Sequence, residues 1–295
     1  MQNTSSECLI RLGSFAGVLM LMALLETLAP RRHAPGGKTR RWANHLSLAA
    51  INTLAARLLL PLSAMIAALV AEERGWGLLH IVSIPDWLAI VIAVVALDLA
   101  IYGQHVLFHA VPALWRLHMV HHADRELDAT TGLRFHTLEI LLSLLIKSAA
   151  VIVLGASAVA VLIFEVLLNA TSLFNHANVN LPGWLDQLLR LFLVTPDMHR
   201  VHHSVYKPET DSNFGFNLPW WDYLFGTYRA QPMEPHTQMR LGLFQFLDAP
   251  VGKLWWILAA PFLGASGRST SAQPVHRRAK EQHADERSLT SSVGS

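Results

Sequence analysis

Histidine is the residue type whose number and spacing point most directly to chemistry in this sequence. The 295 residues contain 16 histidines, and ten of them lie between residues 98 and 203. Two HxxHH boxes, HMVHH and HRVHH, share one spacing, and an HxxxH box, HVLFH, precedes them. Side chains three or four residues apart lie on one face of a helix, so each box would present its imidazoles together. The clustered histidines are His105, His109, His118, His121, His122, His136, His176, His199, His202 and His203.

Neutral imidazole is a ligand for iron, zinc, copper and nickel. Ten imidazoles exceed the three or four protein ligands of one zinc site, and they would supply two metals with four or five nitrogens each. Burying such rings without partners would cost about 1 to 3 kcal/mol per unsatisfied group, and coordination removes that cost. The spacing therefore predicts a two-metal site, whereas single histidines such as His80 and His236 are expected to be ordinary surface or core residues.

The composition is typical of a membrane protein. Hydrophobic residues make up 52% of the chain and charged residues 15%. A net charge of +2, without a basic patch interleaved with aromatic residues, argues against nucleic-acid binding. The one cysteine, Cys8, excludes an internal disulfide and a thiolate metal site, so nitrogen and oxygen must hold any metal.

Apolar stretches predict an all-α integral membrane protein with about four to five membrane-embedded helices. Single spans are expected at 8–28, 45–71 and 87–107, and a helical hairpin at 137–175 with its break at 155–157. The hairpin would place Lys147 and Glu165 at one depth on opposite arms, where they could pair. The loop 31–41 is rich in Lys and Arg and is expected in the cytoplasm. The histidines would then form a helical cap, and the metal site would face the cytoplasm.

The sequence predicts four parts of the chain. Residues 1–97 would be N-terminal transmembrane spans, the first a retained span and not a signal peptide. Residues 98–230 would form the di-metal catalytic region, including the membrane hairpin and an aromatic interfacial wall at 213–229. Residues 231–263 are expected to be an interfacial segment, with a helix from 241, and residues 264–295 a disordered tail.

Ligating histidines need acceptors that fix the tautomer of the ring. Asp98 precedes His105 by seven residues, about two turns, and so shares its helix face. The carboxylates expected to bond the ligand rings are those of Asp98, Asp128, Asp197 and Asp222. For each of them, a solvated or helix-capping carboxylate is the competing interpretation.

The boxes taken together resemble the fatty acid hydroxylase and sterol desaturase superfamily of membrane di-iron oxygenases. The resemblance covers about residues 98–227, through DLAIYGQHVLFH, LWRLHMVHH, FNHANVNLP, TPDMHRVHH and DSNFGFNLPWWDYLFGT. It implies two iron ions that activate O2 to hydroxylate or desaturate a sterol, fatty acyl or related lipid. The ligands it implies are His105, His109, His118, His121, His122, His176, His199, His202 and His203.

Two positions depart from the family pattern. His136 matches the RxHPxE neighbourhood, but Thr137 replaces the proline, so His136 is either a ligand or a residue that bonds one. Asn180 stands where fatty acid hydroxylases have a further histidine. This departure favours the sterol desaturase-like branch, and it leaves one coordination position to Asn180, Asn178, His136 or water.

The sequence has no flavin motif, redox domain or iron–sulfur cysteines. Electrons are therefore expected from a separate ferredoxin or cytochrome b5-like donor, acting as external reductant. Basic residues that could receive an acidic donor are Arg116, Arg125, Arg134, Arg190 and Arg200. The alternatives are a membrane haem electron carrier and a metal transporter. A haem carrier would take its axial ligands from facing helices, whereas the adjacent side chains of His121 and His122 diverge by about 100° on one helix. A transporter would need histidines along a path through the middle of the membrane, whereas these histidines lie at segment ends and in loops.

Overall fold

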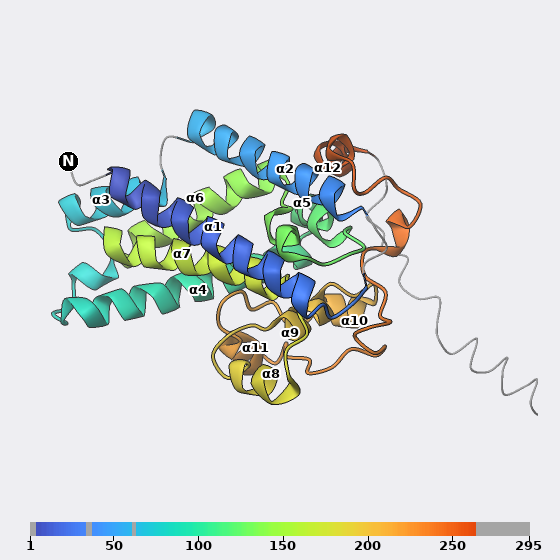
Figure 1. Cartoon of the computed structure of the whole chain (residues 1–295). Coiled ribbons are helices and arrows are strands. Elements are labelled where there is room, and N and C mark those ends of the chain that lie inside the picture. Colours follow the sequence, from blue (N-terminus) through green and yellow to red (C-terminus); the bar gives the residue numbers. More distant parts are fainter. Residues whose placement is uncertain (1–3, 34–36, 61–62, 264–295) are drawn as a thin grey trace, which may run out of the picture. The chain divides into compact units, whose positions relative to one another are not determined.

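The structure, a computed structural model, describes residues 4–33, 37–60 and 63–263. Over these residues it contains helices, turns and two isolated β-bridges, and no strand, which confirms the all-α prediction. The predicted tail, 264–295, lies outside the described residues. The longer helices are α1 (Thr4–Leu28), α2 (Lys38–Leu59), α3 (Ala64–Arg74), α4 (Asp86–Ala110), α5 (Pro112–His122), α6 (Thr137–Leu154) and α7 (Ala158–Asn175) (Figure 1).

Shorter helices carry the rest of the chain, and α8 to α11 gather near the ends of α4 and α7 that bear histidines (Figure 1). They are α8 (Gly183–Leu189), α9 (Pro196–His202), α10 (Lys207–Thr210), α11 (Trp220–Phe225) and α12 (Leu254–Ala259). The 3-10 turns are η1 (Leu78–His80), η2 (Ala129–Leu133), η3 (Phe244–Phe246) and η4 (Ala260–Phe262).

Five helical stretches among the described residues are long and apolar enough to cross a membrane, which agrees with the predicted number. They are 6–28, 38–80, 86–110, 137–154 and 158–175. The second is not one continuous helix, as the sequence had suggested for 45–71, because α2 ends at Leu59 and α3 begins at Ala64. A residue before proline is excluded from the helical region, and Leu60 accordingly has φ −128° and ψ 85°.

The hairpin of α6 and α7 is confirmed, with its break at the predicted position. Gly155 ends α6 at φ +69°, and the Ser157 side chain caps α7 by accepting from the backbone N–H of Ala160 at 3.3 Å. Small residues let α3 and α4 pack closely on both arms, through buried Ala67, Ala93 and Ala160. A rigid four-helix core therefore supports the ends of α4 and α7.

Residues 241–263 do not form the expected single interfacial helix. They form η3, the six-residue α12 and η4, which pack on α2 and α5. Phe246, Trp256 and Ile257 are buried against Leu48 and Met119 in one apolar cluster. This segment therefore covers the helix that carries the first HxxHH box.

Three charged residues inside the spans are joined to one another. Lys147 of α6 bonds the Glu165 carboxylate of α7, which confirms the predicted pair. Arg11 of α1 bonds the same carboxylate and also pairs with Glu7 at 2.8 Å. The Glu165 carboxylate thus ties three helices together.

Replacing Glu165 alone should destabilise the protein more than replacing Glu165 and Lys147 together. Glu165→Leu leaves the Lys147 ammonium half-buried without its carboxylate, a change that costs about 3 kcal/mol for a buried pair. Lys147→Met with Glu165→Leu removes both charges, and Arg11 keeps Glu7. Thermal unfolding in mild detergent measures the difference, and equal losses in the single and double variants would contradict the prediction.

Candidate metal centre

Local sequence signals place the histidine-bearing segments side by side. Pro112 occupies the first turn of α5, so α5 starts directly after α4 and folds back beside it. Thr195 caps α9 by accepting from the backbone N–H of Met198 at 3.3 Å, with Pro196 in the first turn. His176 is the C-cap residue of α7. Four helix segments therefore converge with their imidazoles facing one another.

Nine of the ten clustered histidines form two groups. In each group every residue offers one ring nitrogen, and these nitrogens lie within 4.8 Å of one another. Histidines that are adjacent in the sequence belong to different groups, as His121 and His122 do, and likewise His202 and His203. This follows from the roughly 100° between successive helical side chains. The groups are His105, His109, His118, His122 and His202 in one, and His121, His176, His199 and His203 in the other.

The distances within the groups suit metal coordination. The Nε2 atoms of His105 and His118 are 3.2 Å apart, and those of His109 and His122 are 3.1 Å apart. In the second group, Nε2 of His176 lies 3.1 Å from Nε2 of both His121 and His199. Two nitrogens at right angles about a metal, each about 2.1 Å from it, are about 3.0 Å apart. The observed separations fit adjacent ligands of a metal ion.

Unsatisfied nitrogens support the same conclusion. Nε2 of His202 and both ring nitrogens of His203 are fully buried, and no described group bonds them. Burial lowers the pKa of His202 to about 3 and that of His203 well below its ordinary value. Both rings are therefore neutral at physiological pH, the form that binds a metal. The donor set of each group fits a nitrogen-preferring transition metal.

Hydrogen bonds at the second ring nitrogen orient several of these histidines. Nδ1 of His105 donates to the Phe214 carbonyl at 2.8 Å, and Nδ1 of His202 to the Ser212 carbonyl at 2.7 Å. Nδ1 of His176 donates to the Ser172 carbonyl at 2.7 Å. A carbonyl only accepts, so Nδ1 carries the proton and the Nε2 lone pair is directed into the group.

Glu139 is a site residue that the sequence analysis missed. Its carboxylate, buried at the start of α6, lies 2.6 Å from Nδ1 of His118. The available signal was its position three residues after His136 in RFHTLE. Glu139 is the carboxylate partner expected for a ligand histidine, in place of the aspartates that the sequence suggested.

Asp98 and Asp222 do not bond the clustered histidines, which corrects their expected role. Asp98 accepts from the backbone N–H groups of Asn217 and Leu218, at 3.3 and 3.2 Å, and from Nε1 of Trp221 at 2.8 Å.

Asp222 accepts from the backbone N–H groups of Phe214 and Gly215, both at 2.8 Å, and from the Thr227 hydroxyl at 2.6 Å. A Cβ at Gly215 would lie 2.6 Å from this carboxylate. The two aspartates therefore shape the loop whose Phe214 carbonyl orients His105.

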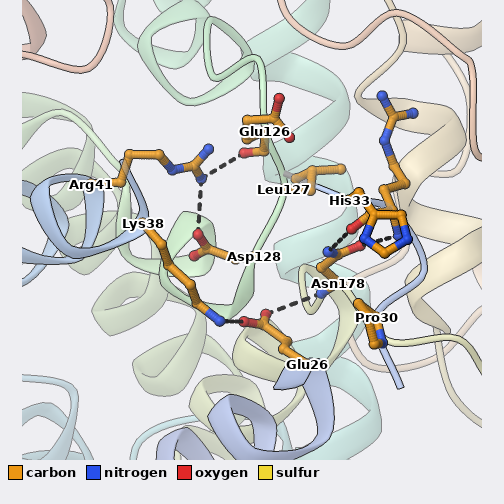
Figure 2. A pocket seen from close by; sticks show the side chains of 10 residues that line it. Glu26, Pro30, His33, Lys38, Arg41, Glu126, Leu127, Asp128 and Asn178 are labelled. Carbon is orange, nitrogen blue, oxygen red and sulfur yellow. Dashed lines mark hydrogen bonds and ion pairs between the residues drawn. The ribbon is translucent and has the colours of Figure 1, made fainter. Parts of the chain in front are cut away.

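Asp128 and the neighbouring Glu26 organise a loop next to the histidines. Both carboxylates line a pocket with Lys38 and Arg41 (Figure 2), and its volume is about 150 Å³. Asp128 caps η2 and pairs with Arg41 at 3.1 Å. Glu26 accepts from the backbone N–H of Ala129 at 2.7 Å and pairs with Lys38 at 2.9 Å. These contacts join α1 and α2 to the loop after the first HxxHH box.

Asp197, Asn180 and His136 also lie outside both groups. Asp197 pairs with Arg31 at 2.9 Å and bonds Arg200, and Asn180 accepts from Arg31 at 3.2 Å. His136 caps α6, with Nδ1 accepting from the Leu138 N–H at 3.1 Å and Nε2 at 3.2 Å from the Leu258 carbonyl. Their bonds hold loops and helix ends, and the structure does not bring them to the clustered imidazoles.

The five arginines considered for a redox partner bond the protein itself. Arg134, Arg190 and Arg200 are buried, and Arg134 donates to the Val120 carbonyl at 2.9 Å, next to His121. Arg116 and Arg125 donate to backbone carbonyls of the 246–261 segment. The three buried arginines are therefore not accessible to a docking partner, whereas for the exposed Arg116 and the partly buried Arg125 the expected role stays a prediction.

Asp222→Asn should destabilise the loop around His105, and the loss should depend on pH. An amide nitrogen cannot accept from the backbone, so one N–H loses its partner at a cost of about 1 to 3 kcal/mol. Burial raises the pKa of Asp222 to about 6, from an ordinary 3.8. The folded wild type therefore takes up a proton before the unfolded chain does, and it gains stability relative to the variant as the pH falls from about 6 towards 3.8. The measurement is thermal unfolding of both proteins across this pH range. A difference in stability that does not change with pH would contradict the prediction.

The region that contains the histidine groups is also the region in which the chain is similar to known proteins. The model of the fatty acid hydroxylase family matches residues 90–227. Ornithine lipid hydroxylase OlsE of Rhizobium tropici is 32% identical over 151 residues, which are 51% of this chain and 44% of that protein. Alkylglycerol monooxygenase of Homo sapiens is 31% identical over 139 residues, 47% of this chain and 30% of that protein. Cholesterol 25-hydroxylase of Rattus norvegicus is 26% identical over 144 residues, 48% of this chain and 47% of that protein.

The chain thus spans less than half the length of these curated relatives. No solved structure matches it. The family match extends beyond both ends of the histidine-rich region, so it includes all nine histidines of the two groups. Over this region the chain is similar to the fatty acid hydroxylase family, which supports the resemblance expected from its histidine boxes.

Proposed function

We propose that this protein is a membrane-bound, O2-dependent, non-haem di-iron oxygenase that hydroxylates or desaturates a lipid. The observation that carries the proposal is the pair of buried imidazole groups, each with its ring nitrogens within 4.8 Å of one another. Its relatives are named as lipid hydroxylases and monooxygenases, which supports an oxidoreductase that acts on a lipid of the membrane.

In this proposal one iron lies in each group, with nitrogen ligands only from the nine histidines. Bound iron would supply the activation of O2. For hydroxylation the balance is R–H + O2 + 2 e⁻ + 2 H⁺ → R–OH + H2O, and desaturation uses the same electrons to give an alkene and two waters. Either reaction needs an external reductant, and a ferredoxin or cytochrome b5-like donor remains our proposal for it.

Aromatic side chains enclose the groups and exclude water from them. The Phe135 ring stacks on His121 with centroids 4.3 Å apart, and the Phe214 ring lies 5.1 to 5.6 Å from the rings of His109, His202 and His105. An apolar surround protects a reactive oxidant from side reactions and favours approach of an alkyl group. The protein's own contribution is thus to orient neutral imidazoles and keep the site dry.

The basic loop supports a cytoplasmic position for the site. Arg31 pairs with Asp197, two residues before His199, and Arg41 pairs with Asp124, two residues after His122. The loop that the positive-inside rule assigns to the cytoplasm therefore contacts both HxxHH segments. We infer that the proposed irons face the same side of the membrane.

The substrate class follows from the relatives, whose names include an ornithine lipid, alkylglycerol and cholesterol. We propose a membrane lipid with a saturated C–H bond that reaches the depth of the histidines. The haem alternative is disfavoured because the centroids of neighbouring clustered rings lie only about 4.4 to 5.5 Å apart. A haem with two axial histidines needs a flat slot between their nitrogens.

Metal analysis tests the proposal directly. Wild-type protein purified in mild detergent from iron-supplemented cells should hold about two irons per chain and show no Soret band. His202→Ala removes a ligand from one group and His121→Ala from the other, so each should lower the iron content and abolish lipid oxidation. His136→Ala is the matched control, because His136 lies outside both groups, and it should retain the iron. Haem, or full iron content in both ligand variants, would overturn the proposal.

Glu139→Gln should weaken metal binding without unfolding the protein. The amide keeps the size of the side chain but loses the charge that orients and polarises His118. Loss of such a partner lowers metal affinity by about 10- to 100-fold. Iron retained during titration with a chelator measures the effect, with Glu126→Gln, a partly buried carboxylate outside both groups, as control. Equal retention by the Glu139 variant and the wild type would contradict the predicted role.

A further inference from the structure

The segments around α8 and α11 expose apolar side chains in an unusual concentration. Among residues 183–193 and 220–226, none of the exposed residues is charged. Eight large hydrophobic side chains are between 43% and 69% exposed, and we call them the aromatic surface. They are Trp184, Leu188, Leu191, Phe192, Trp220, Tyr223, Leu224 and Phe225.

The charges of this region are turned inward. Asp186 and Arg190 of the α8 segment pair with each other at 2.7 Å. Arg190 is buried and also donates to the Ala230 carbonyl at 2.8 Å. A helix that faces water shows the reverse arrangement, with its charges outside and its apolar residues inside. The pattern indicates an apolar medium outside this surface.

The two segments form one unit. Nε1 of Trp220 donates to the Leu191 carbonyl at 2.7 Å, and the Tyr223 hydroxyl donates to the Arg190 carbonyl at 3.0 Å. Trp184 and Leu188 are four residues apart and share one face of α8. The aromatic surface is therefore contributed jointly by α8, the turn after it and α11.

This unit contacts α4 in the second half of the helix, from its middle residue Asp98 onward, and it contacts α7 near the end of that helix. The Phe225 ring stacks on Tyr102 of α4 with centroids 5.5 Å apart, and Trp221 bonds Asp98 of α4. Asn217 bonds Thr171, four residues before the end of α7 and hence about 6 Å from it. The unit thus lies at the level of the last turn of a candidate span, where the bilayer interface is expected.

We propose that the aromatic surface is inserted into the lipid bilayer, at the boundary between the headgroups and the acyl chains of the leaflet nearest the histidine groups. Tryptophan and tyrosine prefer this boundary, and interfacial helices bury their apolar face about 5 to 10 Å into it. The position beside α4 and α7 makes the surface continuous with helices that already face lipid. This inference goes beyond the proposed function and does not depend on iron.

If the aromatic surface is inserted, the loop between Phe214 and Leu224 links the bilayer to the histidine groups. Phe214, at the start of the loop, contacts His105 and His202, whereas Leu224 and Phe225, after it, belong to the aromatic surface. Asp222, between them, fixes the loop by three hydrogen bonds. This loop therefore lies between the imidazoles and a lipid molecule that contacts the aromatic surface.

Spin-label accessibility tests the proposal. In a Cys8→Ser background, single cysteines at Leu224 and Leu188 carry a nitroxide label, and the protein is placed in phosphatidylcholine nanodiscs. Val91, half exposed on α4, is the control inside a span, and Lys207 of α10 is the control in water. Labels at Leu224 and Leu188 should resemble the Val91 label, with high collision rates for oxygen and low rates for chromium oxalate. Rates like those of the Lys207 label would overturn the proposal.

A second measurement needs no spin label, so misfolding of a labelled cysteine variant cannot affect it. Brominated phosphatidylcholine quenches tryptophans that contact acyl chains, so wild-type fluorescence should fall in nanodiscs made from it. Trp220→Phe should lose part of the quenched signal, because this side chain belongs to the aromatic surface. An unchanged quenched signal in Trp220→Phe would count against insertion. Neither readout needs iron or activity, so failure here is distinguishable from failure of the proposed oxygenase.

Discussion

Burial of nine imidazoles in close contact is the constraint on which the rest of this structure depends. Rings that are fully buried cannot carry charge beside one another, and burial accordingly lowers the pKa of His121, His122 and His199 well below the ordinary value. Unpaired ring nitrogens would each be unfavourable in an apolar interior. Two metal ions would satisfy them, which is why we regard metal binding as part of the folding energetics.

Glu139 bonds His118 directly and Asp211 lies 3.4 Å from Nδ1 of His109, whereas several other charged residues near the site act on the backbone. Asp98 and Asp222 gather backbone N–H groups of the 213–222 loop, and Glu26 gathers those of Ala129 and Asn178. Arg134 performs the complementary task by donating to the Val120 carbonyl. Each buried charge is compensated by several hydrogen bonds or by an opposite charge, as the low-dielectric interior requires. Hydrogen bonds to these side chains thereby hold the loops that support the histidines.

The same chain meets lipid in two different ways. In the spans, the charges of Arg11, Lys147 and Glu165 neutralise one another between helices. At the end nearest the histidines, Asp186 and Arg190 pair internally while aromatic side chains face outward. Both arrangements remove charge from the surface that contacts lipid, but the first joins helices together and the second leaves an apolar surface for the bilayer.

The sequence alone determined the features that depend on local periodicity and composition. Hydrophobic length predicted the number of spans and the hairpin at Gly155, and the number and clustering of the histidines predicted that they gather, although each HxxHH box divides between the two groups. These properties are encoded within one helix, so neighbouring residues suffice to read them. The pairing of Lys147 with Glu165 was accessible for the same reason, because a tight turn fixes the register of its two arms.

Only the tertiary structure decided how the histidines divide and what supports them. His122 joins His105 and His109, whereas His121 joins His176 and His199, and this depends on how four helix segments are packed. Glu139 reaches His118, while Asp98 bonds Trp221 and not the nearby His105, because acceptors are chosen by three-dimensional proximity and not by sequence spacing. His136 carries the same side chain as the nine others, yet it caps a helix. Residue type and local spacing could not distinguish these roles, since each depends on contacts between segments far apart in the chain.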